Sequence, residues 1–345
     1  MNKLSIIGHF GKDKEFLDGQ TIKTKIVAKE LENQLGASEV YKIDTYGGKK
    51  ALPKLFFKSI SALKKSKNVV ILPAHNGLKF FVPVLTFFNK FFRRKLYYVV
   101  IGGWLADYLK DKERLEKKLK KFNGIFVETN TMKNALESRG FANVFVMPNC
   151  KELEILTEEQ LVYPKEEPYK LCTFSRVCKE KGIEDAVNAV IEVNEHFGRT
   201  VYSLDIYGQV DSNQTEWFED LKKTFPEYVN YGGLVPFDKS VEVLKDYFAL
   251  LFPTYYEGEG FAGTILDAYA AGIPVIASDW KYNSETVKDG KTGFLFETKN
   301  IEQLKQCLLK IFNDDISLIK RKCLIEAENY LPKQVVSIFL EKING

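Results

Sequence analysis

Acidic residues and glycines surround one short predicted helix in the segment "YYEGEGFAGTILDAYAAGIPVIASDW", residues 255–280. Glu257 and Glu259 precede this helix, and Asp267 lies within it. The glycines of the turn let the backbone bend sharply and approach a ligand without a Cβ in the way. The first N–H groups of the helix, from Phe261 to Thr264, form a site for an anion. The segment therefore predicts the binding of a phosphorylated ligand.

The spacing of Glu259 and Asp267 indicates how that ligand lies. Eight residues of helix would separate the two acids by about 12 Å at a rise of about 1.5 Å per residue. The carboxylates of glycosidases lie about 5–9.5 Å apart across one bond, so a hydrolytic pair is disfavoured. An acid at each end of an extended ligand, with phosphates between them on the helix N-terminus, fits better. The alternative is that Asp267 pairs locally and the glutamates are solvated loop acids.

A second candidate cluster is the pair of cations in "FSRVCKEKG", Arg176 and Lys181. They follow the first strand predicted for the second half of the chain, where a ligand-facing loop belongs. Two cations five residues apart can clamp a diphosphate and stabilise the charge that develops when it departs. Because no Asp-x-Asp pair lies at a strand end, we expect a metal-free site. The alternative is an ordinary solvated turn.

Short apolar runs alternate with helical patterns and define the elements that position these residues. Runs such as "KLSIIGHF" and "NVVILPA" in the first half, and "YSLDIYG" and "ALLFPT" in the second, predict parallel strands covered on both faces. Helical patterns include "TIKTKIVAKELENQL" and "DYLKDKERLEKKLKKF". The polar stretch "CKELEILTEEQLVYPKEEPYK" interrupts the rhythm and predicts a linker. The sequence predicts two doubly wound α/β domains, 1–160 and 165–325, with ligands beyond the carboxyl ends of their strands.

Composition excludes several classes of protein. A formal charge of +4 over 345 residues gives no support to nucleic-acid binding. Five cysteines without a Cys-x-x-Cys pair predict reduced, buried thiols in a cytoplasmic protein, not a zinc site. The N-terminus predicts a first strand and not a signal peptide.

The apolar and basic segment from Phe80 to Lys95 contains Pro83 and is too short to span a bilayer. Two interpretations of it stay open. The first is a buried helix with a solvated turn; the second is a patch that contacts anionic lipid.

Together these segments resemble the retaining GT-B glycosyltransferases of family 4, often called group 1. The Glu-x7-Glu signature of the family appears as Glu259-x7-Asp267, and "SRVCKEKG" is similar to the Arg and Lys clamp on its diphosphate. "LDIYG" and "YGGLV" are similar to segments that hold the nucleotide base, and "DWKYNSETVKDGKTGFLF" to the stretch after the signature. "GHFG…DGQTIKTK" and "VVIGGWL" are similar to a branch common in bacterial capsule and exopolysaccharide synthesis.

The resemblance implies a GT-B fold, with two Rossmann-like domains facing across a cleft. Residues 1–160 would bind the acceptor, residues 165–325 the nucleotide sugar, and a helical tail, 326–345, would pack back on the first domain. The implied enzyme is a retaining, metal-independent hexosyltransferase without a cofactor, whose donor substrate is a UDP or GDP sugar. The implied acceptor is a saccharide linked to polyprenyl diphosphate, at the cytoplasmic face of the cell membrane.

The resemblance also implies roles for single residues. Glu259 would contact the hydroxyls of the transferred sugar and Asp267 those of the ribose, while Arg176 and Lys181 hold the diphosphate and Gly19 closes over it. The implied donor site comprises Gly19, Gln20, Gly208, Leu234, Gly260, Phe261, Ala262, Gly263, Thr264 and Asp267. The implied acceptor site comprises His75, Asn76 and Trp104.

Two departures from the family pattern matter. Asp267 is one methylene shorter than the usual Glu, which shortens its reach by about 1.5 Å. Many members carry a histidine where "IGGWL" stands here; its role is absent or falls to His75 or Trp104. A structural role for His75 is the alternative.

Because no nucleophile stands out, we expect retention by substitution on one face of the sugar, with the departing phosphate as base. Three rival functions stay open: a non-catalytic subunit that binds sugar nucleotides, a glycan phosphorylase, for which no pyridoxal lysine motif is found, and an epimerase, which needs no acceptor.

Overall fold

The computed structural model describes residues 1–12 and 19–344 and divides into two compact units. Unit 1 comprises Met1–Glu152 and Tyr330–Gly345, and unit 2 comprises Leu153–Asn329. The first boundary therefore lies inside the predicted linker, residues 150–170, and before the predicted domain end at residue 160, because part of that linker packs on unit 2. The Leu156 amide donates to the Ala270 carbonyl (2.9 Å), and Leu161 is buried.

Each unit contains one six-stranded sheet in which every pairing is parallel, so the predicted α/β, doubly wound fold class is confirmed. The sheet of unit 1 has the order β2-β1-β3-β4-β5-β6. Its strands are β1 (Asn2–Gly8), β2 (Val40–Asp44), β3 (Ser66–Ile71), β4 (Lys95–Val99), β5 (Gly124–Val127) and β6 (Val144–Val146). The sheet of unit 2 has the order β12-β11-β10-β7-β8-β9. Its strands are β7 (Tyr169–Phe174), β8 (Tyr202–Tyr207), β9 (Val229–Gly233), β10 (Ala249–Phe252), β11 (Val275–Ser278) and β12 (Gly293–Phe296).

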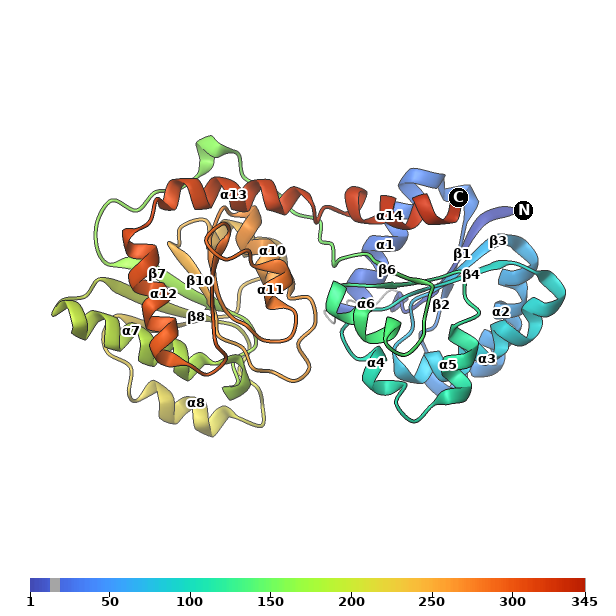
Figure 1. The fold of residues 1–345 in the computed structure, drawn as a ribbon, viewed down its shortest axis with the longest axis horizontal. Coiled ribbons are helices and arrows are strands. Elements are labelled where there is room, and N and C mark those ends of the chain that lie inside the picture. The colour runs from blue at the N-terminus through green and yellow to red at the C-terminus, as the bar shows by residue number, and fades with distance from the viewer. Residues whose placement is uncertain (13–18, 345) are drawn as a thin grey trace. The chain divides into compact units, whose positions relative to one another are not determined.

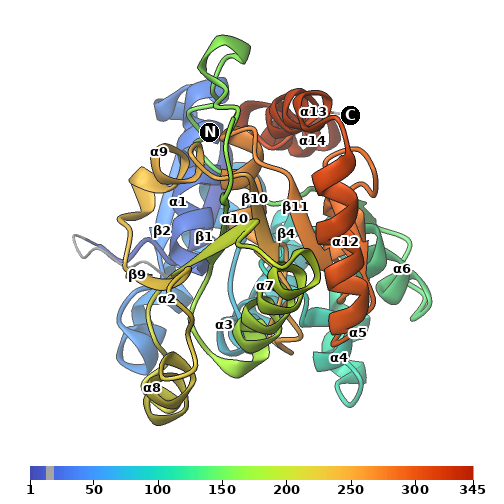
Figure 2. The ribbon, with the colours of Figure 1, turned by 90° about the vertical axis from the view of Figure 1, so that its left-hand side faces the viewer.

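Helices connect the strands of both units (Figure 1). Those of unit 1 are α1 (Gly19–Leu35), α2 (Leu52–Lys65), α3 (His75–Phe92), α4 (Leu105–Tyr108), α5 (Glu113–Leu119), α6 (Asn130–Glu137) and α14 (Pro332–Asn344). Those of unit 2 are α7 (Ile183–Phe197), α8 (Thr215–Lys222), α9 (Ser240–Leu244), α10 (Gly263–Ala270), α11 (Asn283–Thr286), α12 (Ile301–Asn313) and α13 (Ile316–Glu328). Within unit 2, α7 packs beside α12, as Figure 2 shows.

Near-continuous apolar strands explain the burial of both sheets, since helices cover parallel strands on both faces. Strand β10 is buried along its whole length, as are β5 and β11. The C-terminal helix α14 completes the core of unit 1, where it contacts α1. Its residues Val335, Val336 and Phe339 are buried in one cluster with strand residues of that unit.

One predicted helix differs from the structure. The pattern of residues 107–122 predicts a continuous helix, whereas the chain forms α4 and α5 with a break between them. Side-chain donors bind carbonyl oxygens at the break: Arg139 Nη2 donates to the Leu109 carbonyl (3.0 Å), and Lys112 Nζ donates to the Tyr108 carbonyl (2.8 Å). Because Arg139 lies far along the chain, local periodicity could not predict this break.

Two further expectations from composition concern the cysteines and the membrane segment. All five cysteines are free and buried. Across residues 1–12 and 19–344, no helix is long and apolar enough to cross a membrane.

A buried ion pair fixes the carboxyl end of the unit 1 sheet. Lys23 Nζ, on α1, lies 2.5 Å from Glu128 Oε1, which follows β5, and both side chains are 4% exposed. The second carboxylate oxygen of Glu128 accepts from the Gly102 amide (3.2 Å), beyond β4. One carboxylate therefore holds three elements together, and a buried charge of this kind is costly to leave unpaired.

We expect Lys23→Met to lower the free energy of unfolding by about 3–5 kcal/mol, because Glu128 then remains buried without its cation. Urea denaturation measures this change. The matched control is Lys29→Met on the same helix, whose pair with Glu152 (2.7 Å) is largely exposed and screened by solvent, so that its loss should leave the free energy of unfolding nearly unchanged. Equal losses in the two variants would contradict a special role for the buried pair.

Candidate functional site

The candidate site lies where the strand order of the unit 2 sheet reverses. Strands β7 and β10 are neighbours there, although β8 and β9 separate them along the chain. Ligands of doubly wound sheets bind beyond the carboxyl ends of the strands at such a switch point. The loop after β7 carries Arg176 and Lys181, and the loop after β10 carries Glu259. Parallel topology thus brings together residues that are about eighty positions apart.

Lys181 and Glu259 form the central contact of this site. Lys181 Nζ lies 2.6 Å from Glu259 Oε2, and the two side chains are only 10% and 9% exposed. The lysine also lies over the rings of Phe252 and Tyr256, each with its centroid 5.3 Å away. The structure therefore joins a predicted diphosphate cation to a predicted sugar-binding acid.

Thr254 holds Glu259 in place, and sequence reasoning missed it. This fully buried threonine follows β10, and its hydroxyl donates to the same Glu259 oxygen (2.8 Å) that Lys181 contacts. The hydroxyl also accepts from the Tyr256 amide (3.2 Å). Its position two residues after a buried strand, at the carboxyl edge of the sheet, is the signal that could have found it.

The loops after β7 and β10 are bound to each other through the backbone. The Tyr255 amide donates to the Glu180 carbonyl (2.7 Å). Gly182 has a φ of +69°, and a Cβ there would lie 2.2 Å from the Pro253 carbonyl oxygen, so only glycine permits this approach. The short 3₁₀ turn Lys179–Lys181 is thereby pressed against the start of the other loop.

Arg176 lies at the open side of the same site. Its guanidinium is 3.4 Å from Asp211 Oδ2 and 5.3 Å from the ring centroid of Tyr256, and half of the side chain is exposed. Both predicted cations therefore flank one tyrosine ring. Trp280, which follows β11, donates its indole N–H to the Tyr256 carbonyl (2.9 Å).

Helix α10 begins at Gly263, so of the N–H groups predicted to meet an anion, those of Gly263 and Thr264 belong to its first turn and those of Phe261 and Ala262 precede it. The Thr264 hydroxyl is buried and, within the described part of the chain, has no hydrogen-bond partner. Asp267 is buried in the helix. Glu259 precedes the helix in an irregular loop, so the helical spacing assumed for Glu259 and Asp267 does not apply.

The other predicted donor residues are spread over both units. Gly208 follows β8, and a Cβ on it would lie 1.7 Å from the Ser175 carbonyl oxygen, beside Arg176. Leu234 follows β9 and is largely exposed. Gly260, Phe261 and Ala262 belong to the loop before α10.

Two predicted donor residues, Gly19 and Gln20, begin α1 in unit 1. The amide of Gln20 donates to the Leu72 carbonyl, beyond β3. Residues 13–18 of the "GHFG…DGQTIKTK" motif lie outside the described residues. The closure of Gly19 over a diphosphate therefore stays a prediction.

Two of the three predicted acceptor residues, His75 and Trp104, form an aromatic group in unit 1. His75 and Asn76 begin α3, and Trp104 precedes α4. The His75 and Trp104 rings have centroids 3.9 Å apart, and the Tyr108 ring lies 5.0 Å from that of His75. Partial burial and the nearby Lys79 and Lys112 lower the pKa of His75 below its ordinary value, which favours the neutral ring. Tyr108 is a member that the sequence did not indicate.

No group of three or more His, Cys, Asp or Glu side chains in the described parts of the chain could hold a metal ion.

Comparisons with known proteins identify a family for this chain. The family model described as "Glycosyl transferases group 1" matches residues 157–329, which include Arg176, Lys181 and Glu259. The chain is 27% identical over 226 residues to the GtfA subunit of the UDP-N-acetylglucosamine–peptide N-acetylglucosaminyltransferase of Streptococcus gordonii, covering 62% of this chain and 43% of that protein. It is 31% identical over 100 residues to the poly(ribitol-phosphate) alpha-N-acetylglucosaminyltransferase of Staphylococcus aureus, covering 29% and 20%.

The fold is similar to that of solved structures. The apo form of the lipopolysaccharide outer core galactosyltransferase WaaB aligns with a TM-score of 0.75 over 99% of both chains, at 16% identity. This likeness places the chain among proteins of the GT-B fold. The chain spans about half, or less, of the length of the curated relatives that it matches.

We expect Thr254→Val to lower the free energy of unfolding by about 1–3 kcal/mol, because the Glu259 carboxylate and the Tyr256 amide each lose a buried partner. Thr254→Ser is the matched control and should retain most of the stability, since it keeps the hydroxyl. Chemical denaturation of the three proteins measures the difference. A valine variant as stable as the serine variant would show that this hydroxyl does not hold the site.

Proposed function

The chain belongs to the group 1 glycosyl transferases, and from this premise we propose that it moves a hexose from a nucleotide-diphosphate sugar to a saccharide acceptor with retention of configuration. The observation that carries the proposal is the Lys181–Glu259 pair at the switch point of the unit 2 sheet. In this proposal the lysine is the cation for a phosphate and the glutamate beside it is the acid for sugar hydroxyls. Both residues lie in the part of the chain that the family model covers.

In this proposal each residue of the unit 2 site binds a different part of the nucleotide sugar. Arg176 and Lys181 bind the two phosphates, and the first N–H groups of α10 add a partial positive charge. Glu259 accepts from the hydroxyls of the transferred sugar. The Thr264 hydroxyl, buried without a partner in the described structure, supplies a further group at the helix start. Asp267 binds the ribose hydroxyls in this proposal.

The proposed reaction is a substitution on one face of the sugar. The oxygen of an acceptor hydroxyl forms a bond to the anomeric carbon, while the bond from that carbon to the phosphate oxygen breaks and its electron pair leaves with the phosphate. The hydroxyl proton passes to that departing phosphate oxygen. Arg176 and Lys181 stabilise the charge that develops on the diphosphate, and this supports a reaction that needs no metal.

The name of one relative suggests which donor nucleotide to test first. The Streptococcus gordonii relative is named for UDP-N-acetylglucosamine, which makes a uridine donor the first to test. For the acceptor we propose a saccharide on a polyprenyl diphosphate, bound in unit 1 by the His75–Trp104 group together with Asn76. This acceptor fits a role in bacterial surface polysaccharide synthesis at the cytoplasmic face of the membrane.

An exposed aromatic patch on α2 and α3 supports contact with that membrane. Phe57, Phe87 and Phe91 are 70%, 56% and 75% exposed, and the two helices pack side by side (Figure 1). Basic residues accompany these rings on the same helices, at the end of α3 and at the start of β4, namely Lys54, Lys58, Lys90, Arg93 and Lys95. Aromatic side chains beside cations suit the interface of an anionic bilayer. Arg94 serves the fold instead, since its Nε donates to the Leu63 carbonyl (3.0 Å).

Glu259→Gln and Arg176→Ala should each lower turnover at least tenfold, which is about 1.4 kcal/mol of transition-state stabilisation. The donor is first chosen by thermal shift with a panel of UDP and GDP sugars, since a ligand at about 100 times its Kd adds about 2.7 kcal/mol. Turnover is then measured as nucleotide release with a saccharide acceptor present.

The matched controls for this experiment are Glu257→Gln and Lys179→Ala, which change an exposed acid and an exposed cation in the same two loops. The turnover of both control variants should stay within about twofold of the wild type. Addition of EDTA should leave the wild-type turnover unchanged. Near-normal rates for Glu259→Gln or Arg176→Ala would refute the assignment of those residues. A strict need for Mg²⁺ or Mn²⁺ would refute the metal-free site.

Replacing Phe57, Phe87 and Phe91 together by Ser should reduce flotation with phosphatidylglycerol vesicles at least fivefold, because the rings can no longer insert between lipids. Leu318→Ser with Ile325→Ser is the matched control, since these residues are exposed apolar side chains on α13 of unit 2. It should float like the wild type. Equal flotation of the Phe variant and the wild type would exclude this patch as the membrane contact.

A further inference from the structure

Unit 1 contains a cavity of about 770 Å³ beside α3 and the broken helix α4–α5. Five cations line it: Lys79, Lys110, Lys112, Arg114 and Lys118. Its lining has two acids, Asp111 and Glu113. The cavity is large enough for several non-hydrogen groups of a ligand, and its walls are predominantly cationic.

Most of this positive charge is not neutralised by the protein. Lys79, Lys112, Arg114 and Lys118 form no ion pair with any described residue, whereas Lys110 pairs with Asp107 (2.8 Å). Glu113 is itself drawn towards Lys117 (3.8 Å), outside the cavity lining. Concave surfaces lined by one sign of charge concentrate the field and attract counter-ions. The cavity is therefore suited to an anion with more than one charge.

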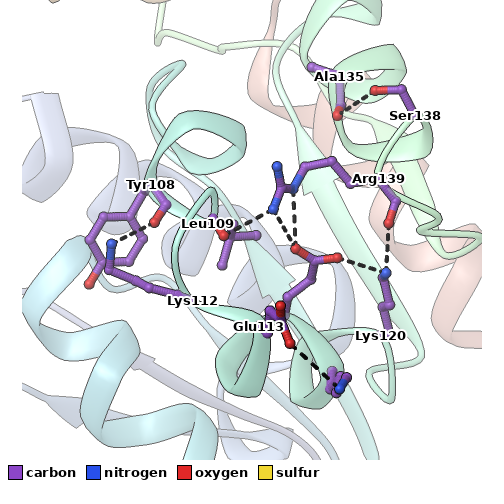
Figure 3. A network of polar contacts seen from close by, with 10 residues as sticks. Tyr108, Leu109, Lys112, Glu113, Lys120, Ala135, Ser138 and Arg139 are labelled. Carbon is purple, nitrogen blue, oxygen red and sulfur yellow. Dashed lines mark hydrogen bonds and ion pairs between the residues drawn. The ribbon is translucent and has the colours of Figure 1, made fainter.

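The wall that carries these cations is firmly held, as Figure 3 shows. Arg139 Nη2 donates to the Leu109 carbonyl and lies 2.6 Å from Glu116 Oε2, and Lys120 donates to the other oxygen of Glu116 (2.8 Å). Lys112 Nζ donates to the Tyr108 carbonyl. These contacts fix the break between α4 and α5, and the break gives residues 110–114 their place along the cavity.

The cavity adjoins the aromatic group proposed to bind the acceptor. Lys79 and Lys112, both in the lining, lie over the Tyr108 ring at 5.7 and 4.2 Å from its centroid. The Tyr108 hydroxyl donates to the His75 carbonyl (3.2 Å), and the ring packs against Trp104 with centroids 5.4 Å apart. A ligand stacked on His75 and Trp104 can therefore extend a charged group towards the cations.

We propose that this cavity binds the phosphate or diphosphate group of the acceptor, so that the acceptor is an anionic, phosphate-bearing saccharide. The inference rests on the proposed function, whose acceptor carries a diphosphate, and adds to it the place in unit 1 where that group binds. Arg114 offers the planar fork that binds two phosphate oxygens at once, and the lysines add point charges around it. A single carboxylate would leave most of these cations without a counter-ion.

The test follows the three tryptophan indole N–H signals of the ¹⁵N-labelled full-length chain by NMR. Trp104 reports on the cavity because it packs against Tyr108, whose ring the lining residues Lys79 and Lys112 contact. Trp280 reports on the donor loop, and Trp217 on α8 is the reference signal. Trp104→Phe and Trp280→Phe assign the first two signals. Pyrophosphate is the probe for the cavity, and UDP is the probe for the donor site.

Pyrophosphate should shift the Trp104 signal of the wild type, and Arg114→Ala with Lys118→Ala should weaken that binding at least about tenfold. Lys117→Ala with Lys121→Ala is the matched control. This control removes two positive charges from the same segment, at residues that do not line the cavity. Its affinity for pyrophosphate should stay within about twofold of the wild type. Flotation with phosphatidylglycerol vesicles is measured for both double variants, and the cavity variant should float like the wild type.

Three results would overturn the inference. The first is a Trp104 signal that does not shift with pyrophosphate, and the second is an equal loss of pyrophosphate affinity in both double variants. The third is a cavity variant that loses vesicle binding but keeps its affinity for pyrophosphate. The last result would assign the cations to lipid headgroups. Failure of the proposed donor site is seen separately, as a Trp280 signal that does not respond to UDP.

Discussion

The buried contact between Lys181 and Glu259 is the interaction on which the unit 2 site depends. It joins the loops after two neighbouring strands, β7 and β10, at the point where the strand order reverses. Two charges that are about one-tenth exposed are stable only when they face each other and are further hydrogen-bonded. The Thr254 hydroxyl supplies that bond, and the close approach of Gly182 to Pro253 permits it. In the proposed function a phosphate of the donor replaces Glu259 as the partner of Lys181. The Glu259 carboxylate then accepts from the hydroxyls of the sugar.

Unit 1 also contains a buried ion pair, and there the pair supports a turn of the chain. Lys23 and Glu128 form a buried pair at the carboxyl end of its sheet, and Glu128 also binds the Gly102 amide. This contact fixes the turn that leads to Trp104. The aromatic group and the cationic cavity therefore stand on a rigid support, as binding residues on loops require if they are to keep their geometry.

The sequence was sufficient for whatever depends on local pattern. Apolar runs alternating with helical patterns predicted both parallel sheets, and the short helix predicted within residues 255–280 is α10, Gly263–Ala270. Long-range contacts were not predictable in this way. The side chain of Arg139 helps to break the helix predicted over residues 107–122, and the Thr254 hydroxyl has meaning only beside Glu259. The cavity in unit 1 also depends on the break between α4 and α5. Because that break comes from a distant residue, no local motif could predict the cavity.

The most direct measurement is a crystal structure of the full chain with UDP bound. The account predicts phosphate oxygens within hydrogen-bond distance of Arg176 and Lys181, at the N-terminus of α10, with Glu259 released from the lysine. UDP bound elsewhere, with the Lys181–Glu259 pair undisturbed at 2.6 Å, would contradict it.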